Sequence, residues 1–287
     1  MHSYVGRTFI RQLRRWFPGG EKLVSMAQPG TASPDNYDLL KEQRCPGLAA
    51  HIRQATTCQE VVQAFFRRVF SPKQVHNCVS LGQNCSTAWY LKQTGNKQAS
   101  FPFDWVFSSS AIILDCIETR FSRYLDVSLI SASQDGESAG HSVYHNRLYA
   151  HRNPLASDAV YGYYTRCCDR FLRLLDDQVP TVFVMTLINE PEKRTAWSSG
   201  FGAAFPMPTG QDAATTQPLR DRLLEINPNA AFLILDHATE QPRCMQAETL
   251  DDRTCLVQFH AEGESNGVHY TDAMDDFCCK LIYAGMC

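Results

Sequence analysis

Apolar runs and helical spacings divide most of the chain into alternating strands and helices. Four runs predict buried strands, because uninterrupted apolar and β-branched residues are typical of strands that are covered on both faces. The clearest run is "TVFVMTLI". The expected strands span residues 75–81, 181–188, 230–235 and 254–259.

Apolar residues three and four positions apart, together with residues that cap helix ends, predict the helices. The expected helices begin at the capping box Thr57–Glu60, at Ser86, at Ser110, at Asp158, at Thr216 and at Thr271. Residues 131–157 and 189–214 are polar and contain glycine, so we expect them to be long loops.

Buried strands that alternate with helices predict an α/β fold, a three-layer sandwich with a mainly parallel sheet. We expect a single domain of this kind over residues 41–287. In such a sheet, ligands bind beyond the carboxyl ends of the strands. The residues that follow each expected strand are therefore the first candidates for a functional site.

Residues 1–40 differ from the rest and are expected to be a separate segment. Residues 1–20 combine four arginines with apolar residues at roughly helical spacing, and residues 18–36 have the composition of a linker. Three interpretations of residues 1–20 stay open: peripheral membrane contact, organellar targeting, and a frayed or docked tail.

Composition narrows the classes of function. The net charge of −3 argues against nucleic-acid binding, which needs a basic face. The chain has 12 cysteines but no C-x-x-C pair and no secretory signal peptide, so we expect free thiols in an intracellular, reducing compartment. We expect no cofactor and no metal, because the spaced pair His141 and His145 falls in an expected loop rather than on a helix.

The strongest candidate for chemistry is Cys85, which follows the first strand and opens a helix. A helix N-terminus carries partial positive charge and free N–H groups, which lower the pKa of a thiol and bind a developing oxyanion. Gly82, Gln83 and Asn84 directly precede Cys85 and are the expected oxyanion and substrate contacts. The alternative is that Cys85 is one of many packed thiols.

A nucleophilic cysteine needs a base, and we expect His269 to supply it. His269 lies in a glycine-containing loop just before the last helix, with Asn266, Asp272 or Asn189 as the residue that orients it. The rivals are His237 and His260 at strand ends and His151 in the long loop, which is also an expected substrate contact. Each of these histidines has the alternative of being packed or solvated.

Asp104 is the other candidate catalytic residue. It lies in "FPFDW", where burial of a carboxylate is costly unless it pairs with a cation, an N–H group or an imidazole. The alternative is a packed aromatic corner in which Asp104 accepts backbone hydrogen bonds.

Two motifs in combination resemble a known family. Ser80-Leu81-Gly82-x-x-Cys85, followed by Pro102-Phe103-Asp104-Trp105, is similar to papain-like cysteine peptidases of unknown function. Tyr164-x-Arg166 and "YAHRN" around His151 extend the likeness over about residues 75 to 190. The resemblance implies a hydrolase that uses a cysteine and a histidine.

The order of elements also resembles the SGNH esterases, which place a nucleophile after the first strand and a base before the last helix. That resemblance implies Cys85 as nucleophile, Asn189 as oxyanion amide and His269 as base, with Asn266 where an acid is expected. A thiol passes acyl groups readily through a thioester. We therefore expect a cysteine-dependent acyl hydrolase or acyltransferase acting on a small-molecule or peptide substrate. The alternative is a binding module that keeps the fold without catalysis.

Overall fold

The computed structural model describes residues 48–70, 77–189, 199–208 and 210–286. The chain divides into two compact units, Met1–Arg53 and Gln54–Cys287. Of the first unit only residues 48–53 are described, at the start of helix α4 (Leu48–Val69). The expected N-terminal segment of residues 1–40 lies outside the described residues.

The second unit is built on one five-stranded sheet in the order β1-β4-β5-β7-β6. Four strands are parallel and β6 pairs with β7 in the antiparallel sense. A separate two-stranded sheet joins β2 and β3. The strands are β1 (Asn77–Ser80), β2 (Ile130–Ala132), β3 (Ala139–His141), β4 (Thr181–Ile188), β5 (Ala230–Ala238), β6 (Cys244–Asp251) and β7 (Thr254–His260).

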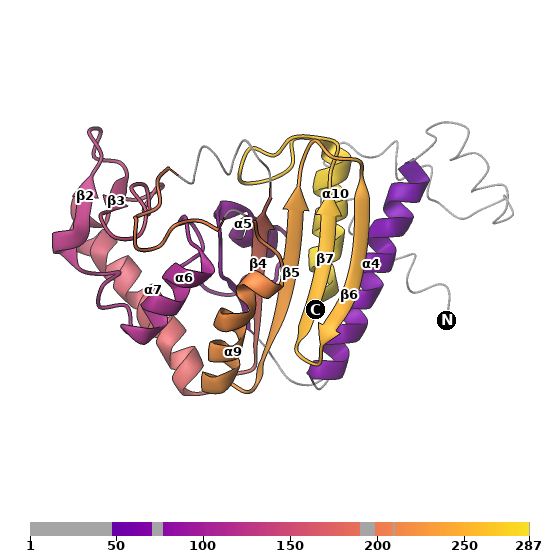
Figure 1. The fold of residues 1–287 in the computed structure, drawn as a ribbon, viewed down its shortest axis with the longest axis horizontal. Coiled ribbons are helices and arrows are strands. Elements are labelled where there is room, and N and C mark those ends of the chain that lie inside the picture. The colour runs from indigo at the N-terminus through magenta and orange to yellow at the C-terminus, as the bar shows by residue number, and fades with distance from the viewer. Residues whose placement is uncertain (1–47, 71–76, 190–198, 209, 287) are drawn as a thin grey trace, which may run out of the picture. The chain divides into compact units, whose positions relative to one another are not determined.

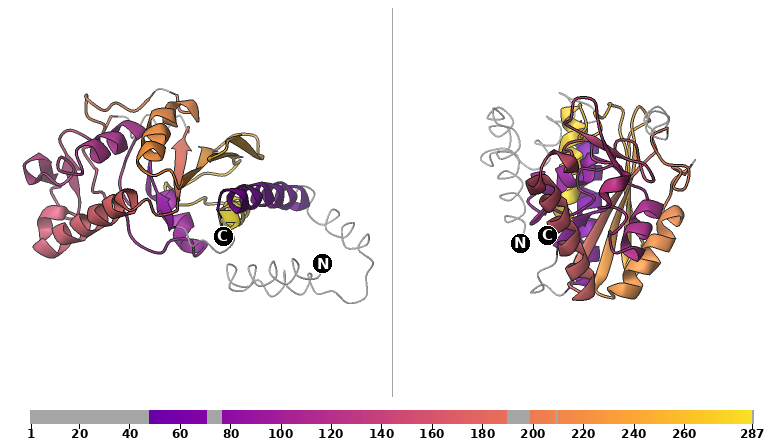
Figure 2. Two further views of the ribbon diagram at one scale, coloured as in Figure 1. Left: turned by 90° about the horizontal axis from the view of Figure 1, so that it is seen from below. Right: turned by 90° about the vertical axis from the view of Figure 1, so that its left-hand side faces the viewer.

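Helices cover both faces of the five-stranded sheet, which confirms the predicted α/β sandwich (Figures 1 and 2). Hydrogen bonds that join Thr87, Thr186 and Tyr283 place α5 and α10 against one face of β4. The opposite face packs Phe183 and Phe232 against α6, α7 and α9 in one hydrophobic core. The helices after α4 are α5 (Cys85–Gln93), α6 (Ser110–Glu118), α7 (Asp158–Asp176), α9 (Gln217–Ile226) and α10 (Ala273–Tyr283).

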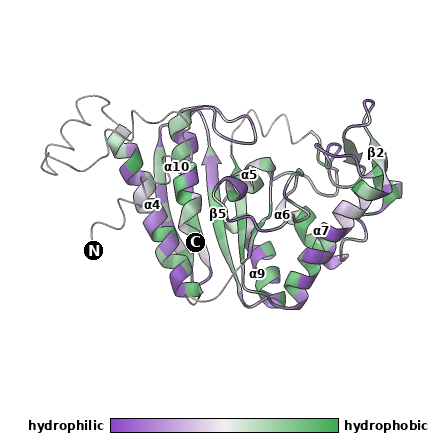
Figure 3. Ribbon diagram, turned by 180° about the vertical axis from the view of Figure 1, so that it is seen from behind, coloured by the Kyte–Doolittle hydropathy of each residue, from purple (hydrophilic) through white to green (hydrophobic). Residues whose placement is uncertain are grey.

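Local sequence explains these elements. All eight residues of β4 are buried, as expected for an apolar strand between two layers of helices. Side chains of Asn84, Ser109, Ser157 and Asp272 cap α5, α6, α7 and α10 by accepting backbone N–H groups. The helices carry both apolar and polar segments in Figure 3, which fits helices with one face on the sheet and the other in solvent.

The structure differs from the sequence prediction at four places. Helix α4 begins at Leu48, so Thr57 lies inside the helix and does not cap it. The expected loop of residues 131–157 contains the hairpin β2–β3, and the polar strand β6 was not expected. Strand β5 runs on to Ala238, so Asp236 and His237 lie within it and not after it. β2 and β3 have only three residues each, and the edge strand β6 has mostly exposed residues, so none of them shows the apolar run that marks a central strand.

Free thiols in the described ranges include those of Cys85, Cys116, Cys167, Cys168 and Cys244. Among the described helices, none is long and apolar enough to cross a membrane.

Candidate functional site

Cys85 is the first residue of α5, directly beyond the carboxyl end of β1. Strand β1 pairs in parallel with the central strand β4, and Leu81 extends this ladder by donating from its backbone N–H to the carbonyl of Val184 at 2.8 Å. Three residues then turn the chain from strand to helix. The predicted strand–turn–helix context of Cys85 is therefore present.

Gly82 makes that turn sterically feasible. Its φ is +84°, and a Cβ at this position would lie 2.2 Å from Oγ of Ser108, which no real contact allows. The Ser108 hydroxyl instead donates to the carbonyl of Leu81 at 2.9 Å, and the backbone N–H of Thr186 donates to the carbonyl of Gly82 at 3.1 Å. The turn is thus fixed from both sides.

Asn84 is the N-cap of α5 and fixes the direction of the helix. Its side-chain Oδ1 accepts from the backbone N–H of Ser86 at 3.0 Å and from the Ser86 hydroxyl at 2.7 Å. Because capping uses the amide oxygen, the amide nitrogen of Asn84 is left without a hydrogen bond among the described residues. This nitrogen and the backbone N–H of Cys85 are the candidate oxyanion donors.

His151 is the histidine that meets the cysteine. Its Nε2 lies 2.9 Å from Sγ of Cys85, within hydrogen-bond distance. The His151 ring also packs edge-on against the indole of Trp105, with ring centroids 6.2 Å apart. The "FPFDW" motif therefore contributes to the site through its tryptophan.

The segment around His151 is anchored on both sides. Tyr149 exchanges backbone hydrogen bonds with Ala139 of β3, and the backbone N–H of Asn153 donates to the carbonyl of Glu137 at 3.1 Å. In addition, the Tyr164 hydroxyl of α7 donates to the carbonyl of Arg152 at 2.9 Å. The hairpin β2–β3 and helix α7 thus hold the imidazole in place beside α5.

Burial sets the protonation of the thiol. Cys85 is 8% exposed, and this desolvation raises the pKa of its thiol to about 12. The direction is opposite to the lowered pKa that the sequence predicts from the helix N-terminus. The dyad at rest is therefore a neutral thiol hydrogen-bonded to an imidazole.

His269, the base expected from the sequence, makes its hydrogen bonds within its own loop. Its Nδ1 lies 2.8 Å from the carbonyl oxygen of Tyr270, and its Nε2 lies 3.2 Å from the amide nitrogen of Asn266. Its ring packs edge-on against Trp89, one helical turn after Cys85, at 5.5 Å between centroids. Within the described ranges, no hydrogen bond joins His269 to Cys85.

Most of the expected oxyanion donors have other partners. The side-chain amide of Gln83 donates to Oε1 of Gln211, and its Oε1 accepts the backbone N–H of Ile188 at 3.0 Å. Asn189 donates from its side chain to Oδ1 of Asp236 at 2.6 Å and to the carbonyl of Gln211 at 2.9 Å. The Gly82 N–H donates to Oγ of Ser80. The hydrogen bonds of Gly82, Gln83 and Asn189 therefore connect residues at the carboxyl ends of the strands.

Asp104 has its own partners away from the imidazole. It is 1% exposed, pairs with the Lys97 ammonium, and accepts the backbone N–H of Phe101 at 2.8 Å. Burial raises the pKa of this carboxyl, and the Lys97 charge opposes that shift. The cation and N–H group that the sequence argument requires for a buried acid are both present.

Four other histidines in the described ranges have structural contacts. Nε2 of His141 lies 2.9 Å from the carbonyl oxygen of Arg123, and His145 stacks on Phe107 at 4.7 Å between centroids. His237 stacks on Tyr270, and His260 lies 3.8 Å from the carboxylate of Asp236. No cluster of three His, Cys, Asp or Glu residues that could hold a metal ion occurs in the described part of the chain.

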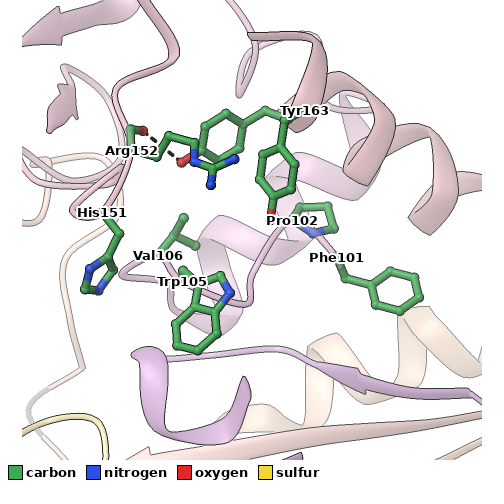
Figure 4. A pocket seen from close by; sticks show the side chains of 8 residues that line it. Phe101, Pro102, Trp105, Val106, His151, Arg152 and Tyr163 are labelled. Atoms are coloured by element: carbon green, nitrogen blue, oxygen red, sulfur yellow. Dashed lines mark hydrogen bonds between the residues drawn. The ribbon is translucent and has the colours of Figure 1, made fainter. Parts of the chain in front are cut away.

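Sequence reasoning missed two features of this site. Gln211 links Gln83 to Ile188, but it lies in a loop whose sequence gives no signal of that role. A pocket beside His151 is lined by Trp105, Arg152 and Tyr163 among others (Figure 4). Here a signal existed, because the motifs "PFDW", "YAHRN" and Tyr164-x-Arg166 all meet at this pocket.

Comparison with known proteins supports the resemblance inferred from those motifs. Residues 76–196 match the family described as "Putative papain-like cysteine peptidase (DUF1796)". The matched range includes Cys85, His151 and the "PFDW" motif, and it ends before His237, His260 and His269. Searches among curated proteins and among solved structures found no match.

Proposed function

We propose that the chain is a cysteine-dependent acyl hydrolase or acyltransferase in which Cys85 is the nucleophile and His151 the base. The observation that carries this proposal is the 2.9 Å contact between Sγ of Cys85 and Nε2 of His151 at the N-terminus of α5. The match to the papain-like cysteine peptidase family over the same residues supports it. The base expected before the last helix, by likeness to SGNH esterases, gains no such support.

The reaction begins with the protonated thiol of Cys85 beside the imidazole of His151. Because burial keeps the thiol protonated, its proton moves to Nε2 of His151 as the sulfur attacks the acyl carbon. An S–C bond forms, and the carbonyl oxygen becomes an oxyanion near the N–H of Cys85 and the amide nitrogen of Asn84. The bond to the leaving group then breaks, and His151 returns the proton to that group. A thioester on Cys85 remains.

The thioester is resolved by a second nucleophile. When water attacks, with His151 taking its proton, the thioester C–S bond breaks, an acid leaves and the Cys85 thiol is restored. When an amine, alcohol or thiol attacks instead, the same steps transfer the acyl group to that acceptor. Hydrolysis and transfer therefore use one dyad, and the concentration of acceptor decides between them.

Acylation of Cys85 by activated esters tests the proposal. The wild type is mixed with p-nitrophenyl acetate, and both the release of p-nitrophenolate and the mass of the Cys85 peptide are followed. We expect an acetyl adduct on Cys85 whose formation slows by about 100-fold or more in His151→Ala. Adding an amine or thiol acceptor separates transfer from hydrolysis, since transfer yields an acylated acceptor.

Two results contradict the proposal. One is acetylation spread over several cysteines at similar rates, with no preference for Cys85. The other is unchanged acetylation of Cys85 in His151→Ala. Either result favours a binding module that keeps the fold without catalysis.

A further inference from the structure

The pocket beside His151 has the size and lining of a small-ligand site. Its volume is about 310 Å³, at the lower end of the range of about 300–1,000 Å³ for such sites. Four aromatic side chains form much of its wall, and His151 and Arg152 complete one side (Figure 4). The aromatic members are Phe101, Trp105, Tyr163 and Tyr164. The imidazole that contacts Cys85 is therefore also part of this wall.

Arg152 gives the pocket a positive charge. None of the lining residues is acidic, and within the described residues Arg152 forms no ion pair. Its guanidinium carbon lies 4.7 Å from the centroid of the Tyr163 ring, so the cation stacks on an aromatic face. A guanidinium over an aromatic ring still has N–H groups that can bind an anion.

The arrangement fits a carboxylate better than other polar groups. A guanidinium edge matches the two oxygens of a carboxylate in a planar, bidentate contact. His151 and Arg152 are neighbours in the chain and both line the pocket. An anion held by Arg152 would therefore lie in the same pocket as the imidazole that contacts Cys85.

We propose that the pocket recognises an N-acylated aromatic amino acid unit with a free carboxylate. The aromatic side chain packs among Trp105 and Tyr163, the carboxylate binds Arg152, and the acyl carbon faces Cys85. This inference rests on the proposed function, because it makes the aromatic amino acid the leaving group. The amide C–N bond breaks, the nitrogen takes the proton held by His151, and the acyl group stays on Cys85 until water removes it.

Binding to a variant that cannot react tests the pocket separately from the chemistry. Calorimetry with Cys85→Ala compares N-acetyl-L-phenylalanine with N-acetyl-L-phenylalanine amide, which lacks the charge. We expect the carboxylate to bind about tenfold more tightly or better, because charge-assisted hydrogen bonds to Arg152 are lost in the amide. Adding Arg152→Gln should remove this difference.

The matched control is Arg173→Gln, which removes an exposed arginine of the same helix as Tyr163, outside the pocket lining. We expect it to leave the tenfold preference unchanged. A C-terminal aromatic dipeptide, acetyl-glycyl-phenylalanine, distinguishes a peptide end from a free N-acyl amino acid by its relative affinity. The affinity of inorganic phosphate for the pocket is measured as well, because a phosphate is the other anion that an arginine binds well.

Three outcomes overturn the pocket proposal. They are equal affinity for the acid and the amide, a preference that persists in Arg152→Gln, and tighter binding of phosphate than of N-acetyl-L-phenylalanine. None of these outcomes contradicts the proposed roles of Cys85 and His151, because acetylation of Cys85 by p-nitrophenyl acetate is measured separately in Arg152→Gln. Conversely, loss of Cys85 acetylation with the carboxylate preference intact contradicts the proposed function alone.

Discussion

Two loops of the molecule each present a histidine near helix α5, and they differ in what the imidazole does. In the loop before α10, both ring nitrogens of His269 face groups of their own loop, the carbonyl of Tyr270 and the amide of Asn266. In the loop between β3 and α7, Nε2 of His151 faces the sulfur of Cys85. The other ring nitrogen of His151 has no partner among the described residues.

The difference shows that position along the chain does not decide which histidine contacts Cys85. His269 packs against Trp89, only one turn of helix after Cys85, yet its hydrogen bonds close its own loop. His151 reaches the sulfur because a hairpin and α7 hold its segment from outside the sheet. A base has to be held by its surroundings while one ring nitrogen stays free for the reaction.

The largest expected effect separates the two histidines directly. We expect His151→Ala to lower the rate of Cys85 acetylation by about 100- to 10,000-fold, because general-base assistance is lost. We expect His269→Ala to change that rate by less than about threefold, because its ring makes no contact with the thiol. Stopped-flow release of p-nitrophenolate measures both rates. Equal losses in the two variants would remove the distinction between the loops.

The second prediction concerns the turn that carries Cys85. Gly82→Ala should lower the free energy of unfolding by about 2–4 kcal/mol, since it combines a clash with Ser108 and a left-handed backbone. Gly95→Ala at the other end of α5 is the control: its φ is +80° but nothing lies within 4 Å of the added Cβ. We expect Gly95→Ala to lower the free energy of unfolding by about 1 kcal/mol. Urea unfolding measures the free energy of unfolding of both variants. Equal losses in Gly82→Ala and Gly95→Ala would contradict the clash with Ser108.

The third prediction uses the raised pKa of the Cys85 thiol. Without a base, little thiolate exists at neutral pH, so alkylation of Cys85 in His151→Ala should rise about tenfold per pH unit between pH 7 and 9. In the wild type the imidazole accepts the proton as the sulfur attacks, so the rate should rise less steeply. His269→Ala should keep the wild-type profile. Parallel profiles in the wild type and His151→Ala would contradict this role of the base.

The smallest expected effect is on the stability of the loop before α10. His269→Ala removes the hydrogen bonds of both ring nitrogens and an edge contact with Trp89, so we expect a loss of about 1 kcal/mol in the free energy of unfolding. Urea midpoints at constant slope measure it. A change in Cys85 reactivity without a change in stability would reverse the roles assigned to this loop.

The central sheet and the position of Cys85 at the start of a helix were predictable from the sequence because their signals are local. The run Thr181–Ile188 forms β4 with the predicted bounds, and Cys85 begins a helix after a buried strand. Capping residues and apolar periodicity act within a few positions, so they can be read without knowledge of the fold.

The contact between His151 and Cys85 was not predictable in the same way. His151 is positioned by Tyr149 and Asn153, which bond to the hairpin β2–β3, and that hairpin consists of short, partly exposed strands in a polar segment. His269 had the expected place before the last helix, but its local hydrogen bonds depend on side-chain geometry. Likewise, the hydrogen bond between the side chains of Gln83 and Gln211 joins residues far apart in the chain. It follows only from the packed structure.

The most direct test of the account is the rate at which iodoacetamide labels Cys85 at pH 7 in three proteins. These are the wild type, His151→Ala and His269→Ala, with the half-exposed Cys244 as internal reference. The account predicts preferential labelling of Cys85 in the wild type and in His269→Ala, and a loss of about 100-fold in His151→Ala. Slow labelling of Cys85 in His269→Ala, with the wild-type rate kept in His151→Ala, would contradict it.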